Sequence, residues 1–295
     1  MDSVMTNLSD TLKGALLMMG AMIGFTFNDG FMRVALETLP LYQAVFLRGI
    51  FIIPALLFLA IRANGLQSRP STKDRWRIRL RTLAEIVGTF LFLTALTRLP
   101  FANISAIMQV IPLAVTLAAA LFLKSPIGWR RIGAILIGFI GVLIVVRPGT
   151  DGFNTASLLI LAVVGIVVVR DLASKTLSAS IPSSSVALHA AIGLSLVNGA
   201  LMLTEPLVSV GLKEWLCLIA AALILTFGYI CSVATMRIGD LATIAPFRYT
   251  ALLWSILIGV LFFDEIPDRW TLIGSAIIVA MGVFSLYRER QVARS

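Results

Sequence analysis

Charged and amide side chains stand inside long apolar segments of this sequence, and they are the residues best placed to do chemistry. Asn28 and Asp29 lie deep in the first apolar run. An ionisable group in a lipid-facing segment costs several kcal/mol unless it faces a cavity or a partner. We therefore predict that this pair contacts a polar substrate or a proton. The alternative is that the first helix ends near residue 27 and that the pair only caps it.

Two further charged positions have both a structural and a functional interpretation. Arg48 in the second run can pair with an acid such as Asp29, contact the substrate, or extend its side chain to the outer interface. We predict a structural pairing, because it would lower the cost of both charges in lipid. Arg170 and Asp171, at the end of the sixth run, form either an exposed terminal pair or a gate.

Prolines interrupt two of the apolar runs. Pro112 lies in the fourth run, one turn after Gln109, and Pro246 lies in the ninth, two residues before Arg248. A proline inside a helix removes a backbone hydrogen bond and frees carbonyl groups, which then need a wet or protein-lined surround. Interrupted spans at corresponding places in two halves of a chain indicate a carrier's binding site. The alternative for Arg248 is a packing kink with a snorkelling side chain.

Aromatic rings near these interruptions offer flat faces for a ligand. Trp254 is central in its run, whereas the other tryptophans lie near run ends, where they anchor a chain at the interface. The predicted substrate-binding residues are Asn28, Asp29, Gln109, Arg248, Tyr249 and Trp254. The predicted structural or gating residues are Arg48, Pro112, Arg170, Asp171 and Pro246.

Composition places these residues in a membrane. The chain is 59% hydrophobic and 13% charged, whereas soluble domains carry about 25% charged residues. A span needs about 20 apolar residues. The runs fall at 14–32, 41–61, 80–98, 101–123, 130–147, 157–175, 184–204, 213–236, 241–263 and 270–287. We predict an all-α integral membrane protein with ten transmembrane helices.

Charge asymmetry between the loops predicts the orientation. With the N-terminus inside, 17 of the 24 Lys and Arg residues lie on the inner side, five lie outside, and two lie within spans. Basic residues accumulate in cytoplasmic loops. Both termini are therefore predicted to be cytoplasmic, and the net charge of +9 reflects topology and not a nucleic-acid-binding face.

The chain also repeats itself. Residues 95–98 match residues 234–237 at an offset of 139, and a Trp and two Gly positions match at an offset of 141. The positions matched at the larger offset are Trp129 with Trp270, Gly133 with Gly274, and Gly141 with Gly282. We predict two five-helix repeats, 1–150 and 151–295, of opposite orientation, as in secondary carriers. Small residues in the last run indicate close helix packing, which is also compatible with a homodimer face.

The order of several motifs resembles the drug/metabolite transporter superfamily, in its ten-span EamA-type branch. The motifs are LYQAVFLRG around Arg48, ALTRLPFANISAI before Pro112, MRIGDLATIAPFRYTALLW, GVLFFDEIP with Glu265, and GSAIIVAMGVF. The first half departs from the family, with Lys124-Ser125-Pro126 where a glycine-glutamate pair is common. The resemblance implies a carrier of the bacterial inner membrane for amino acids, nucleoside-like compounds, vitamins or drugs. Asn28-Asp29 and Arg170-Asp171 resemble a sub-branch of riboflavin uptake carriers, and S-adenosylmethionine carriers look related as well.

The function expected is therefore transport of a small-molecule substrate, with riboflavin or a similar aromatic metabolite as the first candidate. Export of amino acids, related metabolites or drugs is the alternative, and a passive scaffold or channel is a more remote one. An enzyme is not expected, because His189 is the only histidine and the sequence lacks G-x-S-x-G and H-E-x-x-H motifs. No cofactor is expected, and the predicted partners are the substrate and the lipid bilayer.

Overall fold

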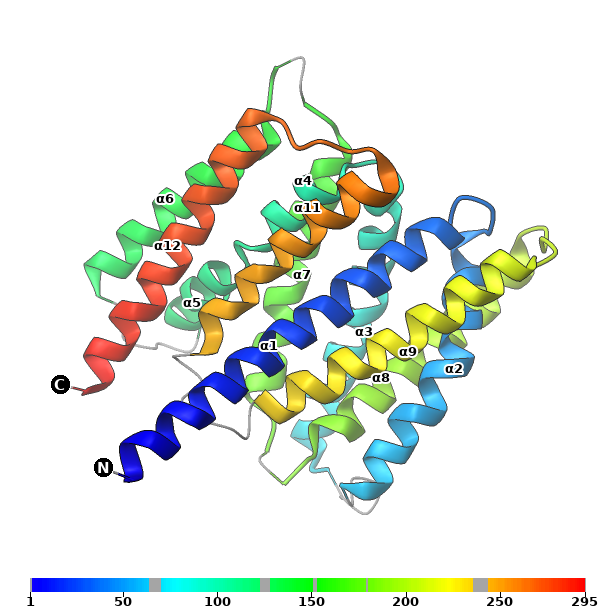
Figure 1. Ribbon diagram of the computed structural model, residues 1–295. Coiled ribbons are helices and arrows are strands. Elements are labelled where there is room, and N and C mark those ends of the chain that lie inside the picture. Colours follow the sequence, from blue (N-terminus) through cyan, green and yellow to red (C-terminus); the bar gives the residue numbers. More distant parts are fainter. Residues whose placement is uncertain are drawn as a thin grey trace. The chain divides into compact units, whose positions relative to one another are not determined.

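The structure, a computed structural model, describes residues 2–63, 70–122, 128–150, 153–178, 180–235 and 244–294, and this part of the chain is helical without a strand (Figure 1). Its elements are α1 (Asp2–Ala35), α2 (Leu41–Arg62), α3 (Thr72–Leu96), α4 (Phe101–Met108), α5 (Ile111–Phe122), α6 (Trp129–Val146), α7 (Ala156–Lys175), α8 (Ser183–Leu201), η1 (Met202–Thr204), α9 (Leu212–Thr235), η2 (Ala245–Tyr249), α11 (Thr250–Phe263) and α12 (Arg269–Arg294). Lys124–Pro126, Arg237 and the start of the ninth run lie outside the described residues.

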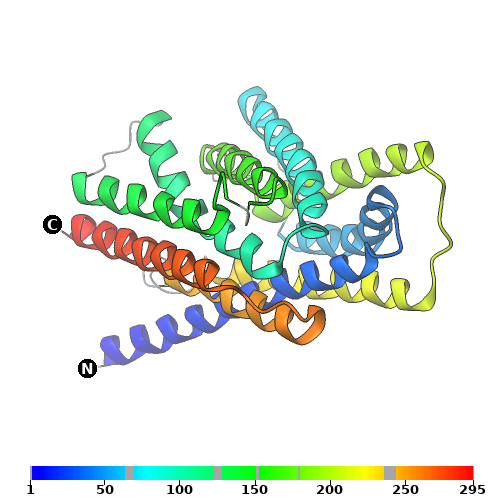
Figure 2. The ribbon, with the colours of Figure 1, turned by 90° about the horizontal axis from the view of Figure 1, so that it is seen from above.

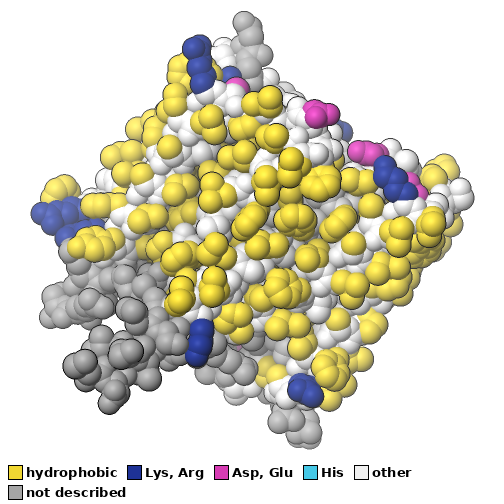
Figure 3. Space-filling view, viewed as in Figure 1, with side chains coloured by type: hydrophobic (Ala, Val, Ile, Leu, Met, Phe, Trp, Pro, Cys, Tyr) yellow, Lys and Arg dark blue, Asp and Glu magenta, His cyan; other side chains and the backbone are white. Residues whose placement is uncertain are grey.

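Nine helical segments of the described part are long and apolar enough to span a membrane. They correspond to nine of the ten predicted runs, with α4 and α5 counted as one segment and η2 and α11 as another. The remaining run corresponds to α3, which begins with the charged segment 72–79 and carries Arg81 and Glu85 within its apolar part. The face of the molecule in Figure 3 is covered by hydrophobic side chains, with Lys, Arg, Asp and Glu at its margins. A surface of this kind is expected for a protein whose solvent is lipid.

Prolines set the starts of three helices. Pro40, Pro100 and Pro182 each stand in the N-cap position, before α2, α4 and α8. Proline is tolerated at the start of a helix because the backbone N–H that it lacks would have no partner there. α3 begins differently, since the Ser71 hydroxyl accepts a hydrogen bond from the backbone N–H of Asp74.

The chain divides into two compact units. Unit 1 consists of Met1–Thr26, Leu99–Val164 and Phe227–Ser295, and unit 2 consists of Phe27–Arg98 and Gly165–Thr226. The division passes through α1, α7 and α9.

In unit 1, α6 and α12 lie side by side over most of their length (Figures 1 and 2). Glycines make this close approach possible. A Cβ atom at Gly274 would lie 2.6 Å from the Gly141 carbonyl oxygen, and one at Gly141 would lie 2.9 Å from the Ile278 side chain. The predicted close packing of the last span is thus used inside the chain, against α6. The short helix α4 packs against α11, α12 and α6.

In unit 2, α8 packs against both α2 and α3. Small residues again allow the contact. A Cβ atom at Gly49 would overlap the Ser195 hydroxyl, and one at Gly199 would lie 2.8 Å from the Phe46 ring. Small residues at helix contacts are expected where lipid supplies no hydrophobic driving force and association depends on close packing.

Candidate functional site

The fourth span is interrupted where the sequence predicts it. α4 ends at Met108 and α5 begins at Ile111, so that Gln109 and Val110 form a turn. Pro112 has no N–H to donate to the Met108 carbonyl, and the Val110 N–H donates to Ile107 O at 3.1 Å instead of continuing the α-helical pattern. The side chain of Gln109 projects from this turn and is buried.

The ninth span has a second irregularity. Residues Ala245–Tyr249 form the 3₁₀ helix η2, and regular α-helix begins only at Thr250. Pro246 lies in the first turn of η2. The Gln109 amide donates to the Tyr249 carbonyl oxygen at 3.5 Å, and both residues are buried. One side chain therefore joins the interruption of the fourth span to that of the ninth within unit 1.

Two buried donors of the ninth span have no hydrogen-bond partner among the described residues. They are the Tyr249 hydroxyl and the Trp254 indole N–H. The Tyr249 hydroxyl lies against Gly282 of α12, where a Cβ atom would overlap it. Trp254 packs against an apolar cluster that includes Met18, Met22 and Ile244. Because an unsatisfied buried donor costs about 1–3 kcal/mol, these two groups are suited to meet an acceptor on a bound molecule.

Arg248 differs from its neighbours in η2. Its side chain is exposed, whereas the adjacent Tyr249 is buried with 6% of its surface accessible. The sequence predicted both residues as substrate contacts. Within unit 1 the structure joins Gln109 to Tyr249, places Trp254 in the second turn of α11 and leaves Arg248 on the surface.

The Asn28–Asp29 pair belongs to unit 2 and contacts Arg48. The Arg48 guanidinium donates to the Asn28 side-chain oxygen at 3.1 Å, and the Asn28 amide donates to the Asp29 carboxylate at 2.9 Å. The helix α1 continues to Ala35, so the pair does not cap a helix ending near residue 27. Arg48 is buried, and it does not snorkel to an interface. Asn28 thus connects the arginine of α2 to the carboxylate of α1.

Arg170 and Asp171 form part of a second polar cluster in unit 2. Arg170 contacts the Asp171 carboxylate at 3.0 Å and Glu85 of α3 at 3.4 Å. Arg81, which the sequence would pair with Glu85 four residues later, donates instead to the Ser174 hydroxyl at 3.1 Å. Arg81 and Glu85 of α3 are therefore both directed to α7. Arg170 and Asp171 lie in the last two turns of α7, as predicted, but both are half-buried and are not an exposed terminal pair.

Glu265 has a partner that the sequence did not indicate. Its carboxylate accepts a hydrogen bond from the backbone N–H of Phe101 at 2.8 Å, at the first residue of α4. Pro100 in the N-cap position offers no side-chain acceptor, so a residue from the loop before α12 supplies one. A carboxylate is favourable there because the first amides of a helix lack partners and carry a partial positive charge.

A further cluster of polar contacts also involves the first turn of α4. Asp268 forms an ion pair with Arg147, which ends α6 in the left-handed conformation, and accepts from the Thr271 N–H at 2.8 Å. The Thr271 hydroxyl in turn donates to the Asn103 side chain of α4 at 2.8 Å. Burial alone would raise the pKa of the Asp268 carboxyl. The hydrogen bonds from Thr271 and Arg147, together with the charge of Arg147, have the larger effect and lower this pKa below its usual value. These contacts join the first turn of α4 to the first turn of α12 and the end of α6.

Long apolar helices, interrupted spans and polar groups within the spans define the class of protein as a polytopic membrane transporter. The model of the EamA-like transporter family matches residues 12–147 and again residues 154–288. The chain belongs to the EamA-like transporter family, which confirms the resemblance found in its motifs. It is a multi-pass protein of the bacterial inner membrane.

Several relatives match over nearly the whole chain. The riboflavin transporter of Vibrio cholerae is 28% identical over 96% of both chains. The pseudopaline exporter CntI of Pseudomonas aeruginosa is 26% identical over 92% of this chain and 95% of the exporter. The S-adenosylmethionine uptake transporter of Rickettsia felis is 25% identical over 96% and 97%. All three are transporters, in agreement with the prediction that the chain is not an enzyme.

A solved crystal structure has the same fold. It matches with a TM-score of 0.61 over 92% of this chain and 98% of the other, at 19% identity. At this identity the likeness concerns the fold alone.

Proposed function

We propose that this protein is a secondary transporter that takes up riboflavin or a similar aromatic metabolite by alternating access. The observation that carries the proposal is the pair of buried donors in the ninth span, Tyr249 Oη and Trp254 Nε1. The Tyr249 carbonyl oxygen also joins this span to Gln109 of the fourth. A flavin ring is planar and has carbonyl and ring-nitrogen acceptors at its edge. Such a molecule can stack on an aromatic face and satisfy both donors.

The similarity to the Vibrio cholerae riboflavin transporter supports this choice of substrate class. The chain also lacks a G-x-x-x-x-G-K-[ST] loop for nucleotide phosphates. The driving force we propose is therefore a proton gradient or the substrate's own gradient. Asp29 is the candidate proton carrier, because its carboxylate lies in a span and is connected to Arg48 through Asn28.

For the topology, we propose that α3 is a tenth span and that both termini are cytoplasmic. Two charged groups in the apolar part of α3 have partners in α7, since Arg81 bonds to Ser174 and Glu85 to Arg170. A helix with such partners can enter a bilayer at a much smaller cost than one with free charges.

Two inverted five-helix halves, 1–150 and 151–295, complete the proposal. Helix pairs within each unit support it, because corresponding members of the two halves pack together. α2 packs with α8 as second and seventh spans, α4 with α11 as fourth and ninth, and α6 with α12 as fifth and tenth. Halves related in this way can exchange conformations and so expose one site to either side of the membrane. A passive scaffold or channel would not need this correspondence.

Export is the second candidate function. The pseudopaline exporter is 26% identical, close to the 28% of the riboflavin transporter, so the relatives support both directions. An exporter of amino acids, related metabolites or drugs would keep the same fold and interruptions. A homodimer through α12 also stays a prediction.

Growth of a riboflavin-requiring bacterial strain tests the proposal. We expect the chain to restore growth on low external riboflavin, and Gln109→Ala and Trp254→Phe to raise the riboflavin concentration required. Trp76→Phe is the matched control, because Trp76 is exposed at the start of α3. A lack of rescue, combined with resistance to a toxic amino-acid analogue, would place the protein among the exporters.

A further inference from the structure

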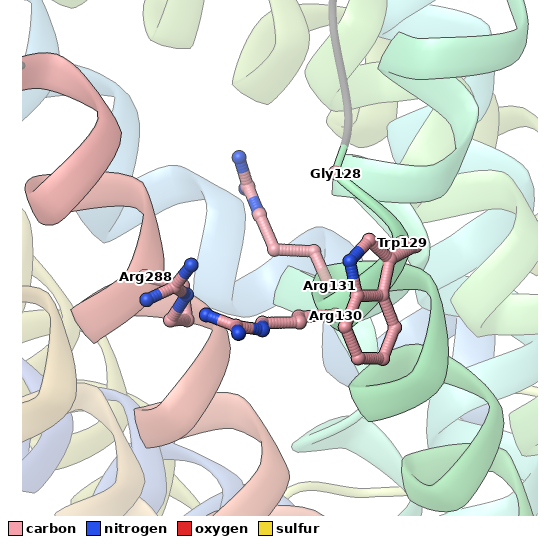
Figure 4. A pocket seen from close by; sticks show the side chains of 5 residues that line it. All are labelled: Gly128, Trp129, Arg130, Arg131 and Arg288. Atoms are coloured by element: carbon pink, nitrogen blue, oxygen red, sulfur yellow. The ribbon is translucent and has the colours of Figure 1, made fainter.

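A hollow of about 170 Å³ lies where α6 begins and α12 approaches its end (Figure 4). It is lined by Gly128, Trp129, Arg130, Arg131 and Arg288. Arg130 and Arg131 extend from the first turn of α6 toward α12, and Arg288 comes from α12 (Figure 4). All these residues belong to unit 1.

The charged residues among those that line this hollow are all arginines. It is lined by three guanidinium groups, and none of the described residues that line it is acidic. Gly128, in the N-cap position of α6, has no side chain to cap the first amides of the helix. The start of a helix adds a partial positive charge of its own. Each guanidinium group carries five N–H donors, so an anion in the hollow would accept charge-assisted hydrogen bonds from more than one arginine.

The surface next to the hollow is apolar and suits a lipid. The Trp129 indole is 77% exposed, and the Arg130 guanidinium lies over it at 5.3 Å from the ring centre. Exposed apolar side chains continue from it along one face of α6, at Ile132, Leu136, Ile140 and Leu143. Their spacing of three or four residues makes a continuous stripe on the helix.

We propose that this hollow binds the phosphate of an anionic phospholipid whose acyl chain lies along the stripe on α6. Arginine forks fit phosphate oxygens, and an indole fits the headgroup level of a bilayer. Charge bias alone would place arginines at this end of the spans, but it would not require them to converge from two helices on one hollow. The stripe distinguishes a lipid from free phosphate, which has no apolar part.

Native mass spectrometry of the purified full-length protein tests the proposal. The probes are phosphatidylglycerol, phosphatidylethanolamine and inorganic phosphate. We compare the wild type with Arg130→Gln/Arg131→Gln/Arg288→Gln. The matched control, Arg62→Gln/Arg75→Gln/Arg79→Gln, removes the same charge from exposed positions of unit 2 that lie on the same predicted side of the membrane.

The wild type should retain phosphatidylglycerol in preference to phosphatidylethanolamine. The triple variant at the hollow should retain at least tenfold less, because each basic residue near a charged headgroup contributes a factor of about five. The control should stay within twofold of the wild type, and millimolar phosphate should not displace the lipid. If the triple variant is not monodisperse, the three single variants replace it, each with an expected loss of about fivefold.

Three results would overturn the proposal. Equal retention by the wild type and the hollow variants would show that the arginines do not hold the headgroup. Equal losses in the hollow and control variants would show a general effect of charge. Displacement of phosphatidylglycerol by inorganic phosphate would assign the hollow to a free anion.

Discussion

Replacement of Tyr249 by phenylalanine removes one buried oxygen atom and leaves the ring in place. The hydroxyl has no partner among the described residues, and the residue is only 6% exposed. Gly282 of α12 leaves room for it, since a Cβ atom there would overlap the oxygen. The Tyr249 hydroxyl therefore occupies space beside α12 without forming a hydrogen bond that stabilises the fold. We expect Tyr249→Phe to impair transport without impairing stability.

The magnitudes follow from the cost of hydrogen bonds. A neutral hydrogen bond contributes about 0.5–1.5 kcal/mol, so loss of one to the substrate should raise the apparent KM about two- to twelvefold. An unsatisfied buried donor costs about 1–3 kcal/mol in the substrate-free protein. Its removal should leave the free energy of unfolding unchanged or raise it.

Saturable uptake of labelled riboflavin and thermal unfolding in detergent measure the two quantities. Tyr42→Phe is the matched control, because it also removes one tyrosine hydroxyl and belongs to unit 2, where the Tyr42 ring stacks on that of Phe90. Gly282→Ala is the opposite perturbation: it should displace the Tyr249 ring and lower both uptake and unfolding temperature. A Tyr249→Phe protein that is destabilised but keeps its apparent KM would refute the reasoning, since the hydroxyl would then be structural.

Three further predictions concern other parts of the molecule. Asp29→Asn should abolish concentrative uptake while exchange persists, because exchange needs no net proton movement; uptake and counterflow assays measure the two activities. Glu265→Ala should lower the free energy of unfolding by about 1 kcal/mol through loss of the acceptor at the start of α4, and Glu265→Gln by less than half of that. Hydrogen bonds from Ser71 and then Ser178 lower the pKa of Asp74 from 3.8 to about 2, so its contribution to stability is present above pH 3.8 and is lost as the pH falls toward 2. The unfolding temperature of the wild type should therefore drop more steeply across this range than that of Asp74→Asn.

A specific result would contradict each of these three predictions. Asp264→Asn is the control, because Asp264 is exposed after the end of α11. Concentrative uptake by Asp29→Asn equal to that of the control would remove Asp29 from the coupling mechanism. Equal stability of Glu265→Ala and the wild type would mean that the cap is not needed. Parallel acid-unfolding curves for the wild type and Asp74→Asn would contradict the lowered pKa.

The spans could be predicted from the sequence because lipid imposes a simple rule. Every backbone polar group in the bilayer needs a partner within its own segment, so an apolar run of sufficient length is a helix. The start of α4 after Pro100 and the break before Pro112 follow from proline geometry in the same local way. The polar residues Arg81 and Glu85 lower the hydropathy of α3, and their contacts with α7 could not be predicted from the sequence.

Partners within the candidate site could not be predicted in the same way. Glu85 pairs with Arg170 of α7 and not with Arg81 of its own helix, because Arg81 is directed to Ser174. Local spacing in the sequence does not show such a contact between helices. Glu265 and Phe101 are 164 residues apart, and no periodicity connects them. Gln109 was singled out by its position before a proline, but its bond to the Tyr249 carbonyl depends on packing between two interrupted spans.

Accumulation of radiolabelled riboflavin tests the central claim most directly. Cells of a riboflavin-requiring bacterial strain would be measured with and without the protein, against a panel of labelled amino acids. We predict saturable inward accumulation of riboflavin that excess unlabelled riboflavin suppresses and amino acids do not. Riboflavin accumulation no higher than in cells without the protein, with the protein present in the membrane, would contradict the account.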